Sequence, residues 1–403
     1  LYDLIIHSVK GIIMPTKLKY LIVAMALNVI GASFLWPLNT IYMSQELGKS
    51  LSIAGFVLLL NSLSAMCGNL FGGKLFDQIG GYKTIMTGGL IAFSSLVGLN
   101  ILHTWPFYAI WLVLLGFGSG MIFPAVYAFA GAIWPEGGRR TFNAIYVAQN
   151  VGVAVGTALA GVVADFSFDY IFIANLLMFV IFATIIFTQF RGVEVDANVD
   201  TSSHNVMEVK NKTIFFAFMS VLIVYFICWF GYVQWQTTIA DLTQHLDISL
   251  KQYSLIWTVN GLMIVFMQPV IKPVIKMLKG KYVGQLIVGV LLFMSAFYFT
   301  SMQTAFSGFL IGMVIMTFGE MFIWPLLPTI AQDIAPKGRT GAYQGLVNST
   351  ATVSRAFGPL VGGFIVDVYN MDILFKSIVG LILFSYIFIG LYSILMKRYQ
   401  RNT

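Results

Sequence analysis

Charged residues are scarce in this sequence. Aspartate, glutamate, lysine and arginine make up only 10% of its 403 residues, whereas hydrophobic residues make up 58%. A soluble chain carries roughly 25% charged residues, so this chain does not have enough charge to solvate most of its surface. The composition excludes an ordinary soluble domain and predicts an all-α polytopic membrane protein.

Cysteine, histidine and catalytic motifs are also scarce. Cys67 and Cys228 both lie inside apolar runs, which excludes a disulfide framework and a CxxC motif. No HExxH motif, paired aspartates or serine with an intramembrane histidine is present, and no GxxxxGK[ST] loop indicates an ATP-driven pump. We therefore expect no enzyme activity, cofactor or metal. The four histidines show no metal-ligand spacing: they are His7, His103, His204 and His245.

Long apolar runs dominate what is present. A membrane-spanning helix needs about 20 apolar residues, and twelve runs of this kind are predicted. Their ranges are 18–42, 52–73, 83–102, 106–131, 142–163, 170–190, 213–236, 253–271, 283–301, 308–331, 342–366 and 373–396.

Lysine and arginine orient these spans. With the N-terminus in the cytoplasm, 19 of the 23 basic residues fall on the cytoplasmic side. Three fall outside (Lys49, Lys251 and Lys376), and Arg355 lies within a span. This bias predicts a cell-membrane protein with both termini in the cytoplasm. It also accounts for the net charge of +7 without a nucleic-acid partner.

Internal similarity divides the chain into halves. LWPLNTIYMSQEL (35–47) returns as QWQTTIADLTQHL (234–246), and Asn61 matches Asn260 at the same offset of 199 positions. FGSGMIFP returns as FGEMFIWP 201 positions later. We therefore predict two six-helix halves, with a solute path at their interface. The expected parts are an N-terminal segment (1–17), the halves (18–190 and 213–396), a cytoplasmic linker (191–212) and a cytoplasmic tail (397–403). Two interpretations of the N-terminal segment stay open: an interfacial helix, or a disordered or incomplete terminus without a signal peptide.

The loop GGKLFDQIGGYK (72–83) carries a family resemblance. It resembles the loop between spans 2 and 3 of the major facilitator superfamily through Gly73, Leu75, Asp77, Gly80 and Lys83. The resemblance implies a twelve-helix fold in which Gly73, Asp77, Gly80 and Lys83 form a gating loop. In that family the aspartate lies near a helix N-terminus of the other half, where the partial positive charge attracts a carboxylate. An ordinary solvated turn is the alternative.

Within that superfamily the chain most resembles the bacterial drug/proton antiporters. The sequence departs from them at Leu112, where an arginine is usual, and at Thr157, where a proline is usual, while AFGPLVGG (356–363) matches their glycine-rich pattern in span 11. The resemblance implies protons and a small molecule as transported partners, and a monomer in the lipid bilayer.

Glu320 is the candidate proton-coupling residue, because it is the single acid well inside a span. A charge at mid-membrane costs about 3 kcal/mol on insertion scales. Arg355 is similarly central in its own span, so a static buried pair of the two is the alternative.

Helical spacing in spans 1, 4, 7 and 10 indicates a cavity that is apolar and aromatic, suited to amphipathic compounds. Packing, or an interfacial belt including Trp36 and Trp235, is the alternative. The candidate substrate-binding residues are Asn28, Asn39, Phe123, Tyr225, Trp229, Tyr232, Gln236, Thr317 and Trp324. The predicted function is proton-coupled efflux; the alternatives are a uniporter or symporter that clamps a small anion with Arg355, and a non-transporting sensor.

Overall fold

A computed structural model describes residues 14–402 apart from 37, 40–41, 50, 194–211 and 279–280. Most of the predicted N-terminal segment (1–17) and of the predicted linker (191–212) therefore lies outside the described residues. Helices make up all the regular structure within the described residues, so the prediction of an all-α polytopic fold is confirmed.

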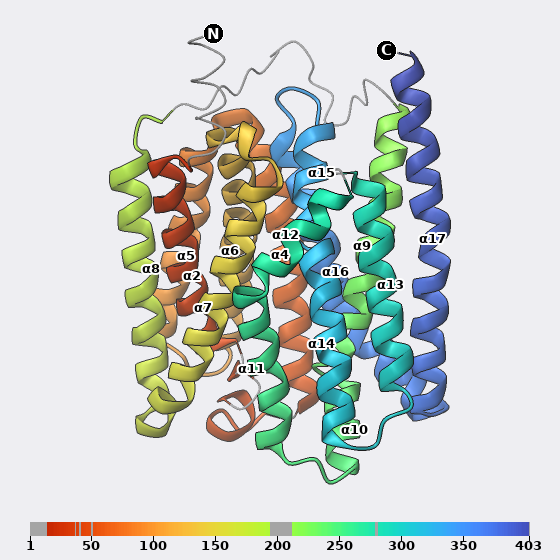
Figure 1. Ribbon diagram of the computed structural model, residues 1–403. Coiled ribbons are helices and arrows are strands. Elements are labelled where there is room, and N and C mark those ends of the chain that lie inside the picture. The colour runs from red at the N-terminus through yellow and green to blue at the C-terminus, as the bar shows by residue number, and fades with distance from the viewer. Residues whose placement is uncertain are drawn as a thin grey trace. The chain divides into compact units, whose positions relative to one another are not determined.

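The described helices group into two compact units. In the first, α2 packs against α7 and α8, and α6 packs against α4 and α5 (Figure 1). Residues 335–349, which include the first turns of α16, belong to this unit. Its other helices are α2 (Thr16–Leu35), α4 (Leu51–Ile79), α5 (Gly81–Ile101), α6 (Phe107–Ile133), α7 (Arg139–Phe166) and α8 (Phe168–Phe190), with short turns η1 (Tyr42–Glu46) and η2 (Pro135–Gly137).

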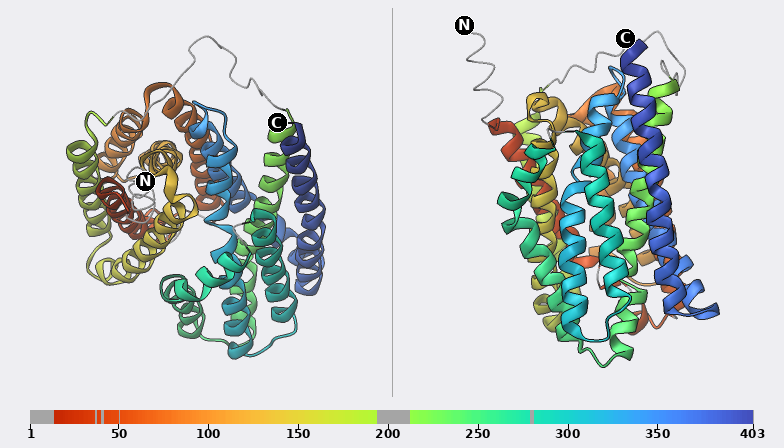
Figure 2. Two further views of the ribbon diagram at one scale, coloured as in Figure 1. Left: turned by 45° about the horizontal axis from the view of Figure 1, so that its top comes forward. Right: turned by 45° about the vertical axis from the view of Figure 1, so that its right-hand side comes forward.

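The second unit contains the helices from α9 onward and the rest of α16. In this unit α17 packs against α9 and α13, and α14 packs against α11 and α13 (Figure 2). Its helices are α9 (Lys212–Gln234), α10 (Thr238–His245), α11 (Leu250–Phe266), α12 (Gln268–Met277), α13 (Tyr282–Thr300), α14 (Phe306–Ile323), α15 (Leu326–Ile334), α16 (Thr340–Val368) and α17 (Met371–Asn402).

The spans match the prediction in number. Eleven helices in the described residues are long and apolar enough to cross a membrane, or twelve if the bent pair α11 and α12 is one span. That pair bends by 58°, where the sequence predicts a single span over 253–271. Pro269 lies in the first turn of α12. A proline there has no N–H to continue the ladder of α11, so a new helix axis begins at this point.

Two other predicted spans are shortened or divided close to a proline. α2 ends at Leu35, before residue 42, and Pro37 follows closely in the sequence. Trp36 still has helical backbone angles, but a proline at position 37 has no N–H to continue the helical hydrogen bonds, so hydropathy overestimates the length of this helix. The span 308–331 divides into α14 and α15 at Trp324 and Pro325, again because a proline N–H is missing.

Candidate functional site

Glu320 lies on α14, in the middle of the 29-residue span Phe306–Ile334, and is 1% exposed. Asn260 on α11 donates to its carboxylate, with Nδ2 3.3 Å from Oε1 and 3.4 Å from Oε2. The Tyr232 hydroxyl on α9 also hydrogen-bonds the carboxylate. Three helices therefore meet at a single buried acid.

Thr317 completes the polar part of this site. It lies three residues before Glu320, so the two side chains share one face of α14. Its hydroxyl donates to the backbone oxygen of Met313 at 2.7 Å and accepts from Asn260 Nδ2 at 2.8 Å. The polar groups near Glu320 thus hydrogen-bond one another in the interior of the second unit.

An aromatic cluster lies beside the acid and is built from four predicted substrate-binding residues. Trp229 and Trp324 stack with ring centroids 4.6 Å apart and an interplanar angle of 2°. The rings of Tyr225 and Tyr232 both contact the Trp324 ring edge-on, with centroids 5.4 and 5.7 Å away. Offset and edge-on arrangements of this kind stabilise aromatic pairs. The structure therefore brings these four rings together in one unit, around Trp324.

Arg355 lies at the rim of the aromatic cluster. Its guanidinium carbon is 4.7 Å from the centroid of the Trp229 ring, a cation–π contact. Its Nη2 donates to Thr352 Oγ1 at 3.4 Å, and the residue is exposed. The charges of Arg355 and Glu320 both act on the Tyr232 hydroxyl. Tyr232 therefore lies within the electrostatic reach of both charges.

The predicted gating residue Asp77 meets a helix N-terminus. Its Oδ1 accepts from the Gly341 N–H at 2.7 Å and its Oδ2 from the Ala342 N–H at 2.8 Å. These amides lie in the first turn of α16, where no intrahelical acceptor exists. The charge of Arg339, which directly precedes α16, also acts on Asp77. A nearly buried carboxylate thus caps α16 within the first unit.

The prediction of a loop over 72–83 is wrong, because Gly73 and Asp77 lie in α4 and Lys83 lies in α5, which leaves Gly80 alone between the two helices. Gly73 packs directly against Gly341, because a Cβ at either position would collide with the backbone oxygen of the other. Gly80 has a φ of +82°, in the left-handed region that favours glycine, and it separates α4 from α5. Lys83 is exposed in the first turn of α5.

The remaining predicted substrate-binding residues lie outside the aromatic cluster. Asn28 on α2 and Phe123 on α6 belong to the first unit, as does Asn39, whose Oδ1 accepts from the Tyr108 hydroxyl at 2.6 Å. Gln236 is exposed beyond the end of α9. The belt interpretation is wrong for Trp235, which is 0% exposed and packs inside its unit.

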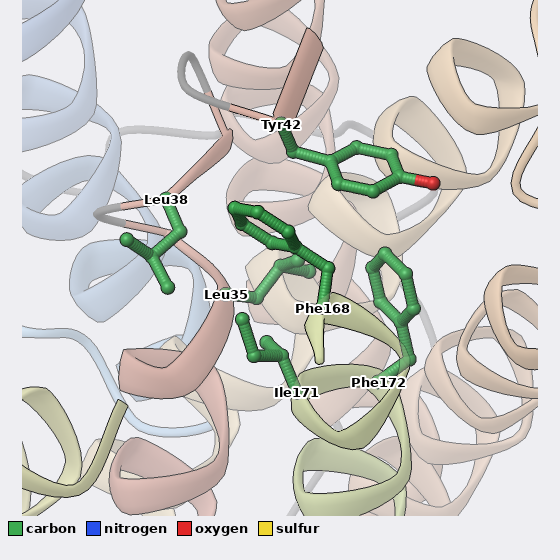
Figure 3. A pocket seen from close by; sticks show the side chains of 6 residues that line it. All are labelled: Leu35, Leu38, Tyr42, Phe168, Ile171 and Phe172. Atoms are coloured by element: carbon green, nitrogen blue, oxygen red, sulfur yellow. The ribbon is translucent and has the colours of Figure 1, made fainter. Parts of the chain in front are cut away.

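A separate apolar recess lies in the first unit, at the N-terminal end of α8. Figure 3 shows the Tyr42 ring lying over Phe168 and Phe172. The surrounding side chains leave no water-sized space inside it. Burial, together with the charges of Asp169 and Glu46, raises the pKa of Tyr42 to about 12. The phenol therefore stays neutral at physiological pH, and this recess is packing.

Sequence reasoning missed Asn260 as a neighbour of Glu320 and Arg339 as a neighbour of Asp77. A signal for Asn260 existed, because it is the repeat partner of Asn61 and a polar residue inside a predicted span. For Arg339, its position three residues before the span predicted to begin at 342 was the signal.

Comparisons with known proteins agree on one family. The family model for the Major Facilitator Superfamily matches residues 21–359 and 221–402. The chain is 50% identical to the uncharacterized MFS-type transporter YttB of Bacillus subtilis (strain 168), over 92% of this chain and 94% of that protein. It is 25% identical to the quinolone resistance protein NorA of Staphylococcus aureus (strain MRSA252), over 84% and 87%. The solved structure of the human organic anion transporter MFSD10 (TETRAN) has a similar fold, with a TM-score of 0.74 at 16% identity, over 93% and 100%.

Proposed function

Because the chain belongs to the Major Facilitator Superfamily, and is therefore a membrane transporter and not an enzyme, we propose that it exports amphipathic organic compounds in exchange for protons. It acts by alternating access as a monomer in the cell membrane, with both termini in the cytoplasm. The observation that carries this proposal is the buried carboxyl group of Glu320 in the middle of a span.

Glu320 is suited to both protonation states. An ionised carboxylate accepts hydrogen bonds only, and Asn260 and Tyr232 supply donors to it. Burial in an apolar environment favours the neutral form instead. Two opposing influences on one group make a proton site sensitive to small changes in its surroundings.

Arg355 is the group whose movement changes the electrostatic surroundings of Glu320. A guanidinium next to a carboxylate shifts its titration by about 1–3 pH units, and each unit corresponds to about 1.4 kcal/mol. Movement of Arg355 between the Trp229 ring and Glu320 therefore supplies up to about 4 kcal/mol of coupling. Energies of this size are enough to bias two conformations.

The aromatic cluster supports amphipathic compounds as substrates. Stacked indoles and tyrosine rings offer apolar faces with few polar groups, a surface that discriminates weakly between flat organic molecules. The name of NorA, a quinolone resistance protein, fits this substrate class and an outward direction of transport.

Arg355 favours a second candidate function. An exposed guanidinium held over an indole is a suitable binding group for a carboxylate or phosphate. The protein would then carry a small anionic metabolite, with Arg355 as the clamp. The two candidates differ in the charge of the transported compound.

Transport in inside-out membrane vesicles tests both functions. We expect ethidium, a flat organic cation, to accumulate when the vesicle interior is acidic, and the anion 8-anilinonaphthalene-1-sulfonate not to accumulate. Glu320→Gln should abolish gradient-driven accumulation while ethidium binding persists, because glutamine cannot exchange a proton. Glu136→Gln, at an exposed glutamate in η2, is the matched control. Accumulation of ethidium by Glu320→Gln at the wild-type level would overturn the proton site, and accumulation of the anion alone would favour the second candidate.

A double variant separates a proton site from a structural ion pair. A structural pair predicts that Arg355→Leu restores the stability and coupling lost in Glu320→Gln, because it removes the charge that the first change leaves without its partner. A proton site predicts that coupling stays lost in the double variant. Recovery of pH-driven transport there would contradict our proposal.

A further inference from the structure

Asn260 has an amide orientation that its neighbours determine. The residue is 4% exposed, and the Thr317 hydroxyl has one proton, which it donates to the Met313 backbone oxygen. Thr317 Oγ1 can therefore only accept from Asn260, so the NH₂ group of Asn260 must face Thr317 and Glu320. One amide hydrogen points to Thr317 and the other lies between the two carboxylate oxygens.

The internal repeat supplies a comparison for this contact. Asn61, 199 positions earlier, donates from α4 to the Leu112 backbone oxygen on α6 at 2.6 Å. Asn260 likewise connects α11 to α14, so holding two helices together is common to both asparagines. The positions that match Thr317 and Glu320 in the first half, 201 residues earlier, are Gly116 and Ser119. The contact with an acid is therefore particular to Asn260.

We propose that Asn260 is a positioning residue that sets the proton affinity of Glu320 by donating to its ionised form. This inference rests on the proposed role of Glu320 as the proton site. Hydrogen bonds donated to a carboxylate favour the charged form, because a protonated carboxyl group is a weaker hydrogen-bond acceptor.

Asn260 lies on α11 and Glu320 on α14, so the proton affinity of Glu320 depends on how these two helices are placed. The contacts to Glu320 are already long, at 3.3 and 3.4 Å, and hydrogen bonds weaken steeply beyond this range. The bend between α11 and α12 begins at Phe266, less than two helical turns after Asn260. A displacement of α11 against α14 therefore removes the donor and promotes proton uptake by Glu320.

Infrared titration of the full-length protein in lipid vesicles tests this inference. The carboxyl C=O band of Glu320 is the band that disappears in Glu320→Gln, and its growth with falling pH gives the midpoint of protonation. Leucine has nearly the shape of asparagine but no donor, so in Asn260→Leu the carboxylate loses stabilisation and the neutral form persists to higher pH. We expect the midpoint to rise by about one unit. Asn260→Asp, which places a second carboxyl group there, should raise it at least as much and serves if the leucine variant does not fold.

Asn61→Leu is the matched control, because it removes the repeat-related bond between helices without touching an acid. We expect its midpoint to equal that of the wild type. An unchanged midpoint in both Asn260 variants, or an equal rise in Asn61→Leu, would overturn this inference and leave Glu320 as the proton site. If no titrating band disappears in Glu320→Gln, the proposed proton site itself is wrong.

Discussion

The contact of Asp77 with the start of α16 allows a quantitative prediction. Gly341 and Ala342 lie in the first turn of α16, where backbone N–H groups have no intrahelical acceptor. The Asp77 carboxylate accepts from both, at 2.7 and 2.8 Å, so we expect it to be the main source of their protection from hydrogen exchange. In Asp77→Asn one oxygen remains as an acceptor. The new NH₂ group cannot accept a hydrogen bond, so one of the two backbone N–H groups loses its acceptor.

The expected loss follows from those two bonds. A hydrogen bond to a charged group contributes about 1.5–3 kcal/mol, and a partly buried charge at a helix N-terminus contributes up to about 2 kcal/mol. A combined loss of about 3 kcal/mol should speed exchange of at least one of these amides roughly a hundredfold. Hydrogen–deuterium exchange with mass spectrometry on peptides covering residues 338–346 measures this rate.

The same variant tests gating. We expect Asp77→Asn to insert and to bind ethidium with unchanged affinity but to transport it more slowly, because the contact affects conformational balance and not the substrate site. Asp372→Asn is the control, since Asp372 is an exposed acid in the first turn of α17 and should change exchange in α16 very little. Unchanged exchange at Gly341 and Ala342 in Asp77→Asn, or a loss of ethidium affinity equal to the loss of transport, would refute the reasoning.

Two further predictions concern packing and topology. Alanine normally stabilises a helix by about 1 kcal/mol relative to glycine, so Gly55→Ala on α4, where the space around the residue is open, should raise the melting temperature. Gly73→Ala should lower the melting temperature, because its Cβ would collide with the Gly341 backbone oxygen. A rise in the melting temperature of both variants would contradict the close packing of Gly73. In a cysteine-free background, an impermeant thiol reagent added to intact cells should label a cysteine at position 49 but not one at position 83; labelling at 83 would overturn the predicted orientation.

Much of the fold could be predicted because its signals are local in the sequence. A membrane span is a property of about 20 consecutive residues, so hydropathy identified the helices without knowledge of their neighbours. The same applies to Glu320 and Asp77, because a lone acid in an apolar run and an acid in a glycine-rich segment both differ from the residues around them in the sequence. The proline breaks after Phe266 and Ile323 were also visible as Pro269 and Pro325, but proline is tolerated in many membrane helices, so the sequence did not show that these would end a helix.

The contacts of these residues depend on which helix faces pack together, and this is known only for the folded chain. Helical period places Asn260, Glu320 and Trp229 on faces of their own helices, yet it does not say which neighbouring helix covers each face. Asp77 finds its donors 264 and 265 residues further along the chain, and Trp235, which hydropathy alone places at a lipid interface, is fully buried. The class of protein, and the residues whose chemistry is unusual for their surroundings, could be recognised from the sequence alone. The packing of helices that are distant in the chain determined what those residues contact. Such contacts join residues far apart in the sequence, so they produce no periodic pattern along it.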